Sequence, residues 1–449
     1  MAAYFWVTGG TGNWNSASNW ALTSGGIGGI AVPGSGDTAT IDANSGSGSV
    51  TLDISPDIQT LTCTGFTGTL AFGSNTSSLN STGTIFTGAT TMTVTGTPQI
   101  ICTNSSATLR TITPTTVTEV NSISFRVTAG TGAVTTTGGA YRDLDFTDGT
   151  NPTGFAGTIS SNSITVYGNL KASTGMLVTA GTAVITFAAT SGTKTIDTAG
   201  VTFDRPFTFN GVGGTFQLVS ALTSGATRTA TLTNGTLNLN NFTLTTGLFA
   251  TNTSNATTLA FGTGNITLSG TGTIFTGSTT CTVTGTPQVI CTNSSATART
   301  ITPQSVTEAN TISFRITAGT GGLTLTGGNY RDLDFTDGVN PTGYAGAIGG
   351  STTQNVYGNF KASTGMTQTP GASGLNFVAT SGTKTINTAG VTFDRPIAFN
   401  GVGGTFQLQA ALTSGSTRTC TLTNGTLDLA SYTLTTGIFS STNSNTRTL

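Results

Sequence analysis

TATLTNGTLNLNNFTLTTG, at residues 229–247, contains the pattern that decides the fold. Alanine and leucine alternate with threonine and asparagine on both sides of Asn234-Gly235. Alternation with a period of two predicts short β-strands that bury one face, and the Asn-Gly pair predicts a turn between them. Because Asn-Gly is also the strongest signal for a two-residue hairpin, this stretch taken alone leaves an antiparallel meander open.

The same pattern returns at residues 419–437 as TCTLTNGTLDLASYTLTTG. The apolar positions stay apolar, whereas polar positions change, for example Asn238 to Asp428 and Asn240 to Ala430. A face that keeps its apolar character while the other face varies is typical of strands with a buried side and a solvent side.

This pair of stretches belongs to a duplication of about 190 residues, in which residues 71–259 return as residues 260–449. TGTIFTG begins at Thr82 and again at Thr271, and roughly two-thirds of the positions match by eye. We therefore divide the chain into an N-terminal region, residues 1–70, followed by a first and a second repeat copy.

The composition predicts an all-β protein. Threonine makes up roughly a quarter of the chain, glycine occurs 63 times, and charged residues are only 7%. Turn signals recur with a spacing of about 20 residues, which fits one coil of a β-helix, and about 20 such coils would use the whole chain. The sequence thus predicts an elongated β-solenoid, with tandem β-sandwich domains as the alternative.

The sequence lacks the residues that several functional classes require. The chain has no histidine, so it has no Ser-His-Asp or Cys-His arrangement, and we expect no enzyme. The net charge is −1 and no basic stripe occurs, which argues against nucleic-acid binding. No run approaches about 18 apolar residues, so we expect no membrane span. Five cysteines without CxxC spacing indicate buried apolar filler and no redox or metal role.

All three tryptophans lie in FWVTGGTGNWNSASNW, as Trp6, Trp14 and Trp20. An aromatic platform for carbohydrate is one interpretation. We favour a structural cap, because the first coil of a stack otherwise leaves apolar side chains and strand edges open.

The densest charged segment is RDLDFTDG, which occurs in both copies. Alternation places two of its aspartates on the solvent face of a strand and the third in the turn that follows. Three oxygen-bearing side chains this close suggest a calcium site, although the spacing is not that of an EF-hand and Arg142 is available to neutralise the group. Paired carboxylates also occur in glycosidases, but a segment duplicated with its surroundings is better explained by architecture. The tentative calcium ligands are Asp143, Asp145 and Asp148 in the first copy and Asp332, Asp334 and Asp337 in the second.

The opening FWVTGGTGNW, the later DTATIDANSG and the body segment FNGVGGTFQL resemble a class of repetitive bacteriophage and prophage virion proteins. An inserted Thr8, and Ile41 where that class has phenylalanine, are the departures. The resemblance implies a tail-fibre-like structural protein and brings no catalytic residues or cofactor.

From this resemblance and the composition we expect a fibre- or spike-like structural protein on the surface of a phage particle, with a part in host attachment. The expected partners are other virion proteins, a host glycan or protein receptor, and further copies of the chain, because near-identical repeats favour exchange between subunits. The alternatives are a bacterial surface adhesin of autotransporter-like type and a capsid decoration protein.

Overall fold

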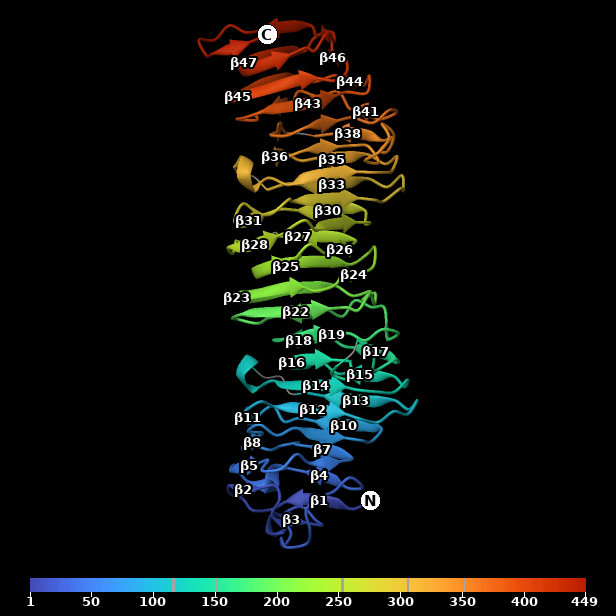
Figure 1. The fold of residues 1–449 in the computed structure, drawn as a ribbon, viewed down its shortest axis with the longest axis vertical. Helices are drawn as coiled ribbons and strands as arrows, with labels where there is room; N and C mark the ends of the chain where they lie inside the picture. Colours follow the sequence, from blue (N-terminus) through green and yellow to red (C-terminus); the bar gives the residue numbers. More distant parts are fainter. Residues whose placement is uncertain (115–117, 151, 252–253, 305–306, 351) are drawn as a thin grey trace. The chain divides into compact units, whose positions relative to one another are not determined.

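The computed structural model describes the chain except for residues 115–117, 151, 252–253, 305–306 and 351 (Figure 1). The protein is 45% strand and 3% helix, which confirms the all-β prediction. Its strands form the stacked parallel coils of a β-solenoid with about 17 turns. No helix in the described ranges is long and apolar enough to cross a membrane.

The coils are longer than the sequence spacing suggested. Thr135 and Ser160, whose hydroxyls meet between paired strands of neighbouring coils, stand 25 positions apart in the chain. Asn104 donates its side-chain amide to the carbonyl oxygen of Asn80, 24 positions earlier. Longer coils explain why about 17 turns form where the sequence spacing predicted more.

The tandem-sandwich alternative was wrong. Sandwiches need antiparallel sheets, whereas the pairing from coil to coil is parallel, as between Leu61 and Phe86 or between Arg110 and Val134.

The described residues form two compact units, residues 1–224 and residues 225–449. The repeat boundaries fall inside strands: β8 (Thr69–Ala71) crosses the first, and β28 (Thr257–Ala260) crosses the second. The repeat is therefore a period in the sequence, and its ends are not ends of structural units.

In the first unit, three sheets run along the coils. The first contains β1 (Ala3–Trp6), β3 (Trp20–Ala21), β4 (Thr38–Thr40), β7 (Thr60–Thr62), β10 (Gly83–Thr87), β13 (Arg110–Thr113), β15 (Val134–Thr136), β17 (Thr158–Ser161) and β20 (Leu177–Val178). The second contains β2 (Gly12–Asn13), β5 (Ser49–Thr51), β8 and β11 (Thr93–Thr95). The third contains β6 (Asp57–Ile58), β9 (Ser77–Leu79), β12 (Gln99–Cys102), β14 (Ile123–Val127), β16 (Gly139–Asp145), β18 (Ile164–Val166), β19 (Leu170–Lys171), β21 (Ile185–Phe187), β22 (Thr193–Asp197) and β23 (Phe207–Leu218). β24 (Leu222–Thr223) and the 3-10 turns η1 (Ala17–Asn19), η2 (Ala43–Ser45) and η3 (Glu119–Asn121) complete the unit.

The second unit repeats this plan. Its strands are β25 (Thr229–Asn238), β26 (Thr243–Thr246), β27 (Leu248–Ala250), β28, β29 (Asn265–Leu268), β30 (Gly272–Thr276), β31 (Cys281–Thr284), β32 (Gln288–Cys291), β33 (Arg299–Thr302), β34 (Ser313–Ile316), β35 (Leu323–Leu325), β36 (Gly328–Tyr330), β37 (Leu333–Asp334), β38 (Ala347–Gly349), β39 (Gln354–Val356), β40 (Phe360–Lys361), β41 (Thr367–Gln368), β42 (Leu375–Phe377), β43 (Thr383–Asn387), β44 (Thr392–Phe393), β45 (Ile397–Leu408), β46 (Leu412–Ser414), β47 (Thr419–Asp428), β48 (Leu434–Thr435), β49 (Ile438–Ser440) and β50 (Arg447–Thr448). One 3-10 turn, η4 (Glu308–Asn310), corresponds to η3.

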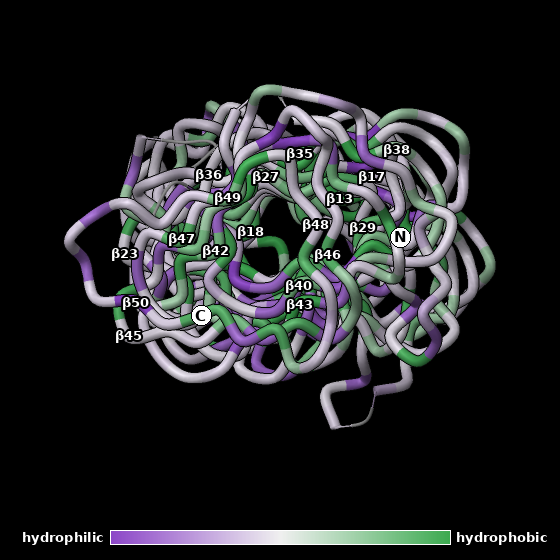
Figure 2. Tube along the Cα trace, turned by 90° about the horizontal axis from the view of Figure 1, so that it is seen from above, coloured by the Kyte–Doolittle hydropathy of each residue, from purple (hydrophilic) through white to green (hydrophobic). Residues whose placement is uncertain are grey.

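Inward-pointing apolar side chains fill each unit, and in the trace seen from above hydrophobic residues recur along the coils between hydrophilic ones (Figure 2). Rings stack from coil to coil: Phe187 and Phe209 have centroids 5.5 Å apart, and the matching Phe377 and Phe399 are 5.4 Å apart. The five cysteines are free and buried among these residues, which confirms their role as apolar filler.

The tryptophans gather at the start of the first unit. All three rings are fully buried, with Trp20 packed edge-on at 5.3 Å from Trp6 and 4.7 Å from Trp14. The short strand β3 pairs antiparallel with β1 and forms the outermost strand of its sheet. The rings thus fill the first coil and present no exposed face on which a sugar could stack.

One local prediction needs correction. Asn234-Gly235 does not close a hairpin: β25 runs through it, with Gly235 at a φ of 74° bending the strand around a corner of the coil. The glycine-rich GVGG at residues 211–214 lies inside β23. A Cβ on Gly211 would lie 1.8 Å from the carbonyl oxygen of Ala189 in the neighbouring coil, so only glycine fits there.

Candidate functional site

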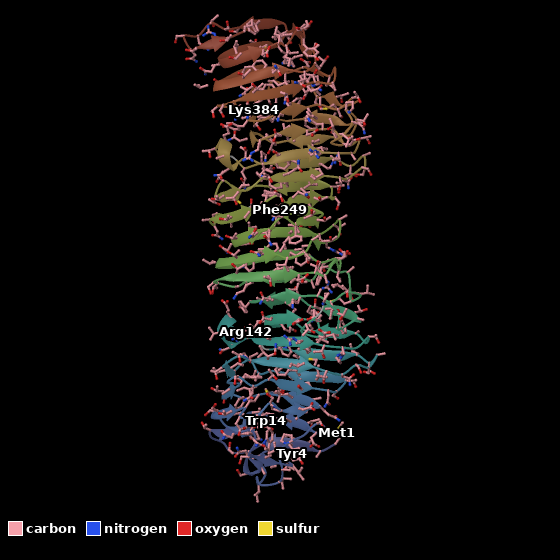
Figure 3. The ribbon with its side chains drawn as sticks, in the orientation of Figure 1. Met1, Tyr4, Trp14, Arg142, Phe249 and Lys384 are labelled. Atoms are coloured by element: carbon pink, nitrogen blue, oxygen red, sulfur yellow. The ribbon has the colours of Figure 1, made fainter. Side chains whose placement is uncertain are left out.

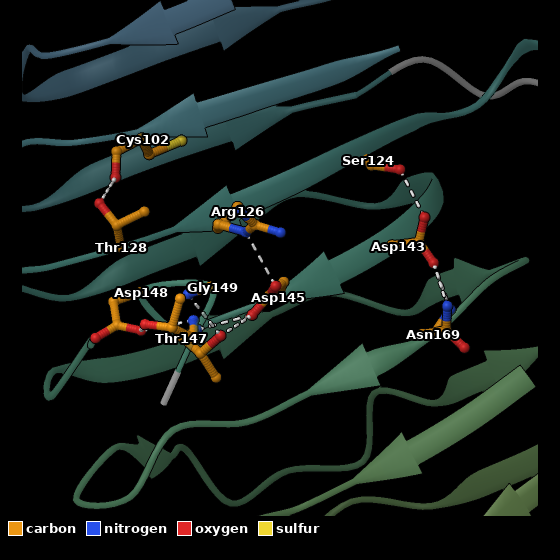
Figure 4. Close-up of polar contacts among 11 residues, drawn as sticks. Cys102, Ser124, Arg126, Thr128, Asp143, Asp145, Thr147, Asp148, Gly149 and Asn169 are labelled. Carbon is orange, nitrogen blue, oxygen red and sulfur yellow. Dashed lines mark hydrogen bonds and ion pairs between the residues drawn. The ribbon is translucent and has the colours of Figure 1, made fainter. Parts of the chain in front are cut away.

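Asp143 is held by side chains of the coils on both sides of it (Figure 4). Ser124 donates its hydroxyl to Oδ2 at 2.7 Å, and Asn169 donates its backbone N–H and its side-chain amide to Oδ1 at 2.7 and 3.0 Å. The second copy repeats the arrangement around Asp332, where Ser313 donates at 2.6 Å and the backbone N–H of Asn359 at 2.7 Å. These carboxylates are therefore fixed by the protein itself.

Asp145 forms an ion pair with Arg126 of the preceding coil, with Nε 3.0 Å from Oδ2. Its other oxygen accepts the backbone N–H and the hydroxyl of Thr147. Arg142, the neutralising group considered from the sequence, donates to the carbonyl oxygen of Val120. In the second copy Arg315 pairs with Asp334 at 3.3 Å.

The third pair of predicted ligands lies in the turn that follows. Asp148 accepts the backbone N–H and hydroxyl of Thr150. Asp337 accepts hydrogen bonds from the side chain and backbone of Asn340, which lower the pKa of this carboxyl below its usual value. The structure thus gives each aspartate its own set of protein partners. Within the described ranges no group of three metal-ligating side chains occurs, and calcium binding stays a prediction.

The outward side chains of these coils form a ladder of alternating charge. In register, Arg126 lies opposite Asp145, Asp145 opposite Lys171, and Lys171 opposite Asp197. The second copy has the same order, Arg315, Asp334, Lys361 and then Asn387, so its last rung is neutral. Opposite charges at neighbouring rungs stabilise the pairing of parallel strands.

A 3-10 turn reaches across this face in each copy. The carboxylate of Glu119, in η3, accepts the backbone N–H and hydroxyl of Thr190, 71 residues further along the chain, at 3.1 and 2.6 Å. Arg142 donates to the carbonyl oxygen of Val120 in the same turn and lies on the outside of its coil (Figure 3). In the second copy the hydroxyl of Thr380 donates to Glu308 at 2.5 Å. In the second copy η4 forms one wall of a hollow, through Glu308 and Ala309.

A half-buried tyrosine and a glycine lie beside this wall. Gly358 follows Tyr357, and a Cβ on Gly358 would lie 2.4 Å from Oδ1 of Asp332, so a side chain here would displace that carboxylate. Gly168 has the same relation to Asp143, at 2.3 Å. Burial, and then the nearby carboxylate of Glu308, raise the pKa of Tyr357, so its phenol keeps the proton and stays a hydrogen-bond donor.

We call these two groups of residues the lysine clusters. The first comprises Glu119, Arg126, Arg142, Asp143, Asp145, Tyr167, Asn169, Lys171 and Lys194, and the second comprises Glu308, Arg315, Arg331, Asp332, Asp334, Tyr357, Asn359, Lys361 and Lys384. All nine positions have the same residue in both copies. Together they contain every lysine and every glutamate of a chain that is only 7% charged.

The clusters line hollows in the surface. In the second copy one hollow of about 170 Å³ includes Arg315, Asp334 and Lys361, and another of about 310 Å³ includes Glu308, Tyr357 and Lys384. Asp332 and Asn359 line both, so the two hollows adjoin. The hollow of about 250 Å³ in the first copy has the same lining residues as the smaller one of the second.

The aspartates of these clusters were predicted from the sequence, whereas the lysines, Tyr167, Asn169 and Glu119 were not. A signal for them was present in the duplication. These positions are identical in both copies and include every lysine and every glutamate of a chain that is only 7% charged.

Comparison with protein-family models, with curated proteins and with solved structures gave no match. The function is therefore argued from the fold and from the lysine clusters.

Proposed function

We propose that this protein is a structural, fibre- or spike-like component of a bacteriophage particle, and that its outward face takes part in attachment to the host surface. The observation that carries the proposal is the parallel stacking of its coils. Each coil contacts its neighbours through backbone ladders, so the outward side chains are not needed for a core and remain available to a partner. The resemblance of the opening residues to repetitive virion proteins supports the same assignment.

The surface chemistry agrees with an attachment role. Most outward positions carry threonine, serine or asparagine, which form many weak neutral hydrogen bonds, and the lysine clusters are the places where charge gathers. A receptor glycan offers hydroxyl and carboxylate groups to such a surface, and electrostatic complementarity selects among glycans. The other partners that we propose are neighbouring virion proteins and further copies of this chain.

The experiment is localisation on the particle. Antibody raised against the purified chain is applied to purified virions produced by the genome that encodes it, and the label is located by electron microscopy. Label on the outside of the particle supports the proposal. Label on the host cell surface in cultures without phage particles contradicts it and favours the adhesin alternative, and label over the head alone favours the decoration protein.

A further inference from the structure

We propose that each lysine cluster is a binding site for a carboxylate-bearing polysaccharide, such as a chain of uronic or sialic acid residues. The inference deepens the proposed function, because it names the class of receptor for the attachment surface. It rests on which groups of the clusters the protein uses itself and which it leaves free.

The carboxylates are the groups in use. Asp332 accepts hydrogen bonds on both oxygens, Asp334 is paired with Arg315, and Glu308 holds Thr380. The first copy satisfies Asp143, Asp145 and Glu119 in the same way. A cation would have to displace these partners, so the clusters are poorly prepared for a metal ion.

The lysine and arginine side chains of the clusters, in contrast, have N–H donors that the protein does not use. For the ammonium groups of Lys171, Lys194, Lys361 and Lys384, no ion pair or hydrogen bond occurs with any described residue. Arg331 uses one Nη atom on the carbonyl oxygen of Ala309, which leaves further N–H donors for a ligand. In the second copy an incoming carboxylate would therefore meet Arg331 and Lys384 in the larger hollow, with Lys361 in the adjoining one, and would not compete with an internal ion pair.

The floor of the larger hollow suits a sugar ring. Tyr357 is half-buried and lines this hollow together with Gly358 and Asn359. An aromatic face packs against the C–H face of a pyranose, and hydroxyl groups of the sugar would add to the hydrogen bonds that Asn359 and Asp332 already make within the protein. The same three residue types stand at Tyr167, Asn169 and Asp143.

Duplication fits a polymeric ligand. A repeating polysaccharide presents the same group many times, and two sites on one chain raise the apparent affinity when both can be engaged. Each site alone is expected to be weak, because exposed charge pairs contribute little in high dielectric.

The test measures binding of the purified chain to immobilised polygalacturonate, polysialic acid and hyaluronan, with uncharged dextran as the control polymer. Three variants are compared with the wild type. One changes all four lysines to glutamine, the matched control changes the same four to arginine, and the third combines Tyr167→Ala with Tyr357→Ala. Hydrogen exchange of the coils confirms that each variant is folded.

We expect binding to at least one acidic polymer and none to dextran. The glutamine variant should bind at least about tenfold more weakly, whereas the arginine variant should retain binding and its decrease with added salt. The tyrosine variant should also weaken binding, because stacking on the ring is lost. Equal binding by the glutamine variant, or no binding to any of the three acidic polymers, overturns the inference. If the antibody labels virions but the chain binds no acidic polymer, this receptor class is wrong and the structural role on the particle still stands. If the chain binds an acidic polymer but the antibody does not label virions, the binding site stands and the role on the particle is wrong.

Discussion

Replacing Gly211 by alanine should open the coil stack at one place. The added Cβ would lie 1.8 Å from the carbonyl oxygen of Ala189 in the adjacent coil, whereas ordinary contact begins at 3.4 Å. The two backbones must therefore separate by about 1.6 Å, the difference between these distances, to restore van der Waals contact. Coils in a parallel stack are about 4.8 Å apart, so this displacement breaks ladder hydrogen bonds around the site.

The cost of overpacking is about 1–3 kcal/mol, and each lost ladder hydrogen bond adds about 1 kcal/mol. We expect a local loss of about 3 kcal/mol, which raises amide exchange rates roughly a hundredfold. Hydrogen exchange read by mass spectrometry should show this in β21, β22 and β23 and leave β45 of the second unit unchanged. In Gly401→Ala the added Cβ would lie at the same 1.8 Å from the carbonyl oxygen of Ala379. This variant should raise exchange in β45 and leave β21, β22 and β23 unchanged.

The matched control is Gly322→Ala, because nothing lies within 4 Å of the position of its Cβ and its φ lies outside the left-handed region. This variant should exchange nearly like the wild type. Wild-type exchange in Gly211→Ala would show that β21 and β23 are not adjacent coils, and the reasoning about the fold would then be wrong.

Three further predictions concern the core, the predicted calcium ligands and the first coil. Burial raises the pKa of the Cys102 thiol from 9.0 to about 12, so the thiol's contribution to stability is complete below pH 9.0 and is lost as the pH rises toward 12. The urea concentration at the midpoint of unfolding should therefore decrease as the pH rises through this range, and the decrease should be smaller in Cys102→Ala than in the wild type. A midpoint that does not change with pH would contradict the burial of the thiol. Because Asp145 is already paired with Arg126, millimolar calcium should leave Tm unchanged, whereas a rise in Tm that Asp145→Asn abolishes would establish the calcium site. Trp14→Ala should cost about 3–5 kcal/mol locally, visible as faster exchange in β1, β2 and β5, and unchanged exchange there would show that the ring does not support the first coil.

The fold class was predictable because its signal is local and repeated. Period-two alternation, as in residues 229–247, shows strands, and turn signals at regular spacing show coils. The turn at Asn234-Gly235 was misread because a hairpin and the corner of a coil both use a glycine with positive φ. Only the pairing between strands of successive coils separates the two cases, and no short stretch contains that information.

The buried arginines could not be predicted from a local pattern. Arg110 is fully buried, with its guanidinium 5.4 Å from the centre of the Phe155 ring and Nη1 donating to the carbonyl oxygen of Asn104 at 2.8 Å. Gly130 makes room for it, since a Cβ there would lie 2.6 Å from Nη2. In sequence this arginine stands at the edge of an ordinary strand, and its burial follows from the neighbouring coils.

The lysine clusters show the same limit for function. The aspartates stand together in one segment and were found, whereas Glu119, Tyr167 and Lys194 come from separate coils that only the register of the stack brings together. Their recurrence in both copies is visible in the sequence, but identity alone does not single them out, because roughly two-thirds of all positions match.

The most direct test of the central claim, that the outward face of this solenoid attaches a phage particle to its host, is competition for adsorption. Host cells are incubated first with the purified chain, and the adsorption rate of the phage is then measured. We expect that the wild-type chain lowers the rate, that the four-lysine arginine variant does so equally, and that the glutamine variant does not. An adsorption rate that the wild-type chain leaves unchanged at saturating concentration would contradict the claim.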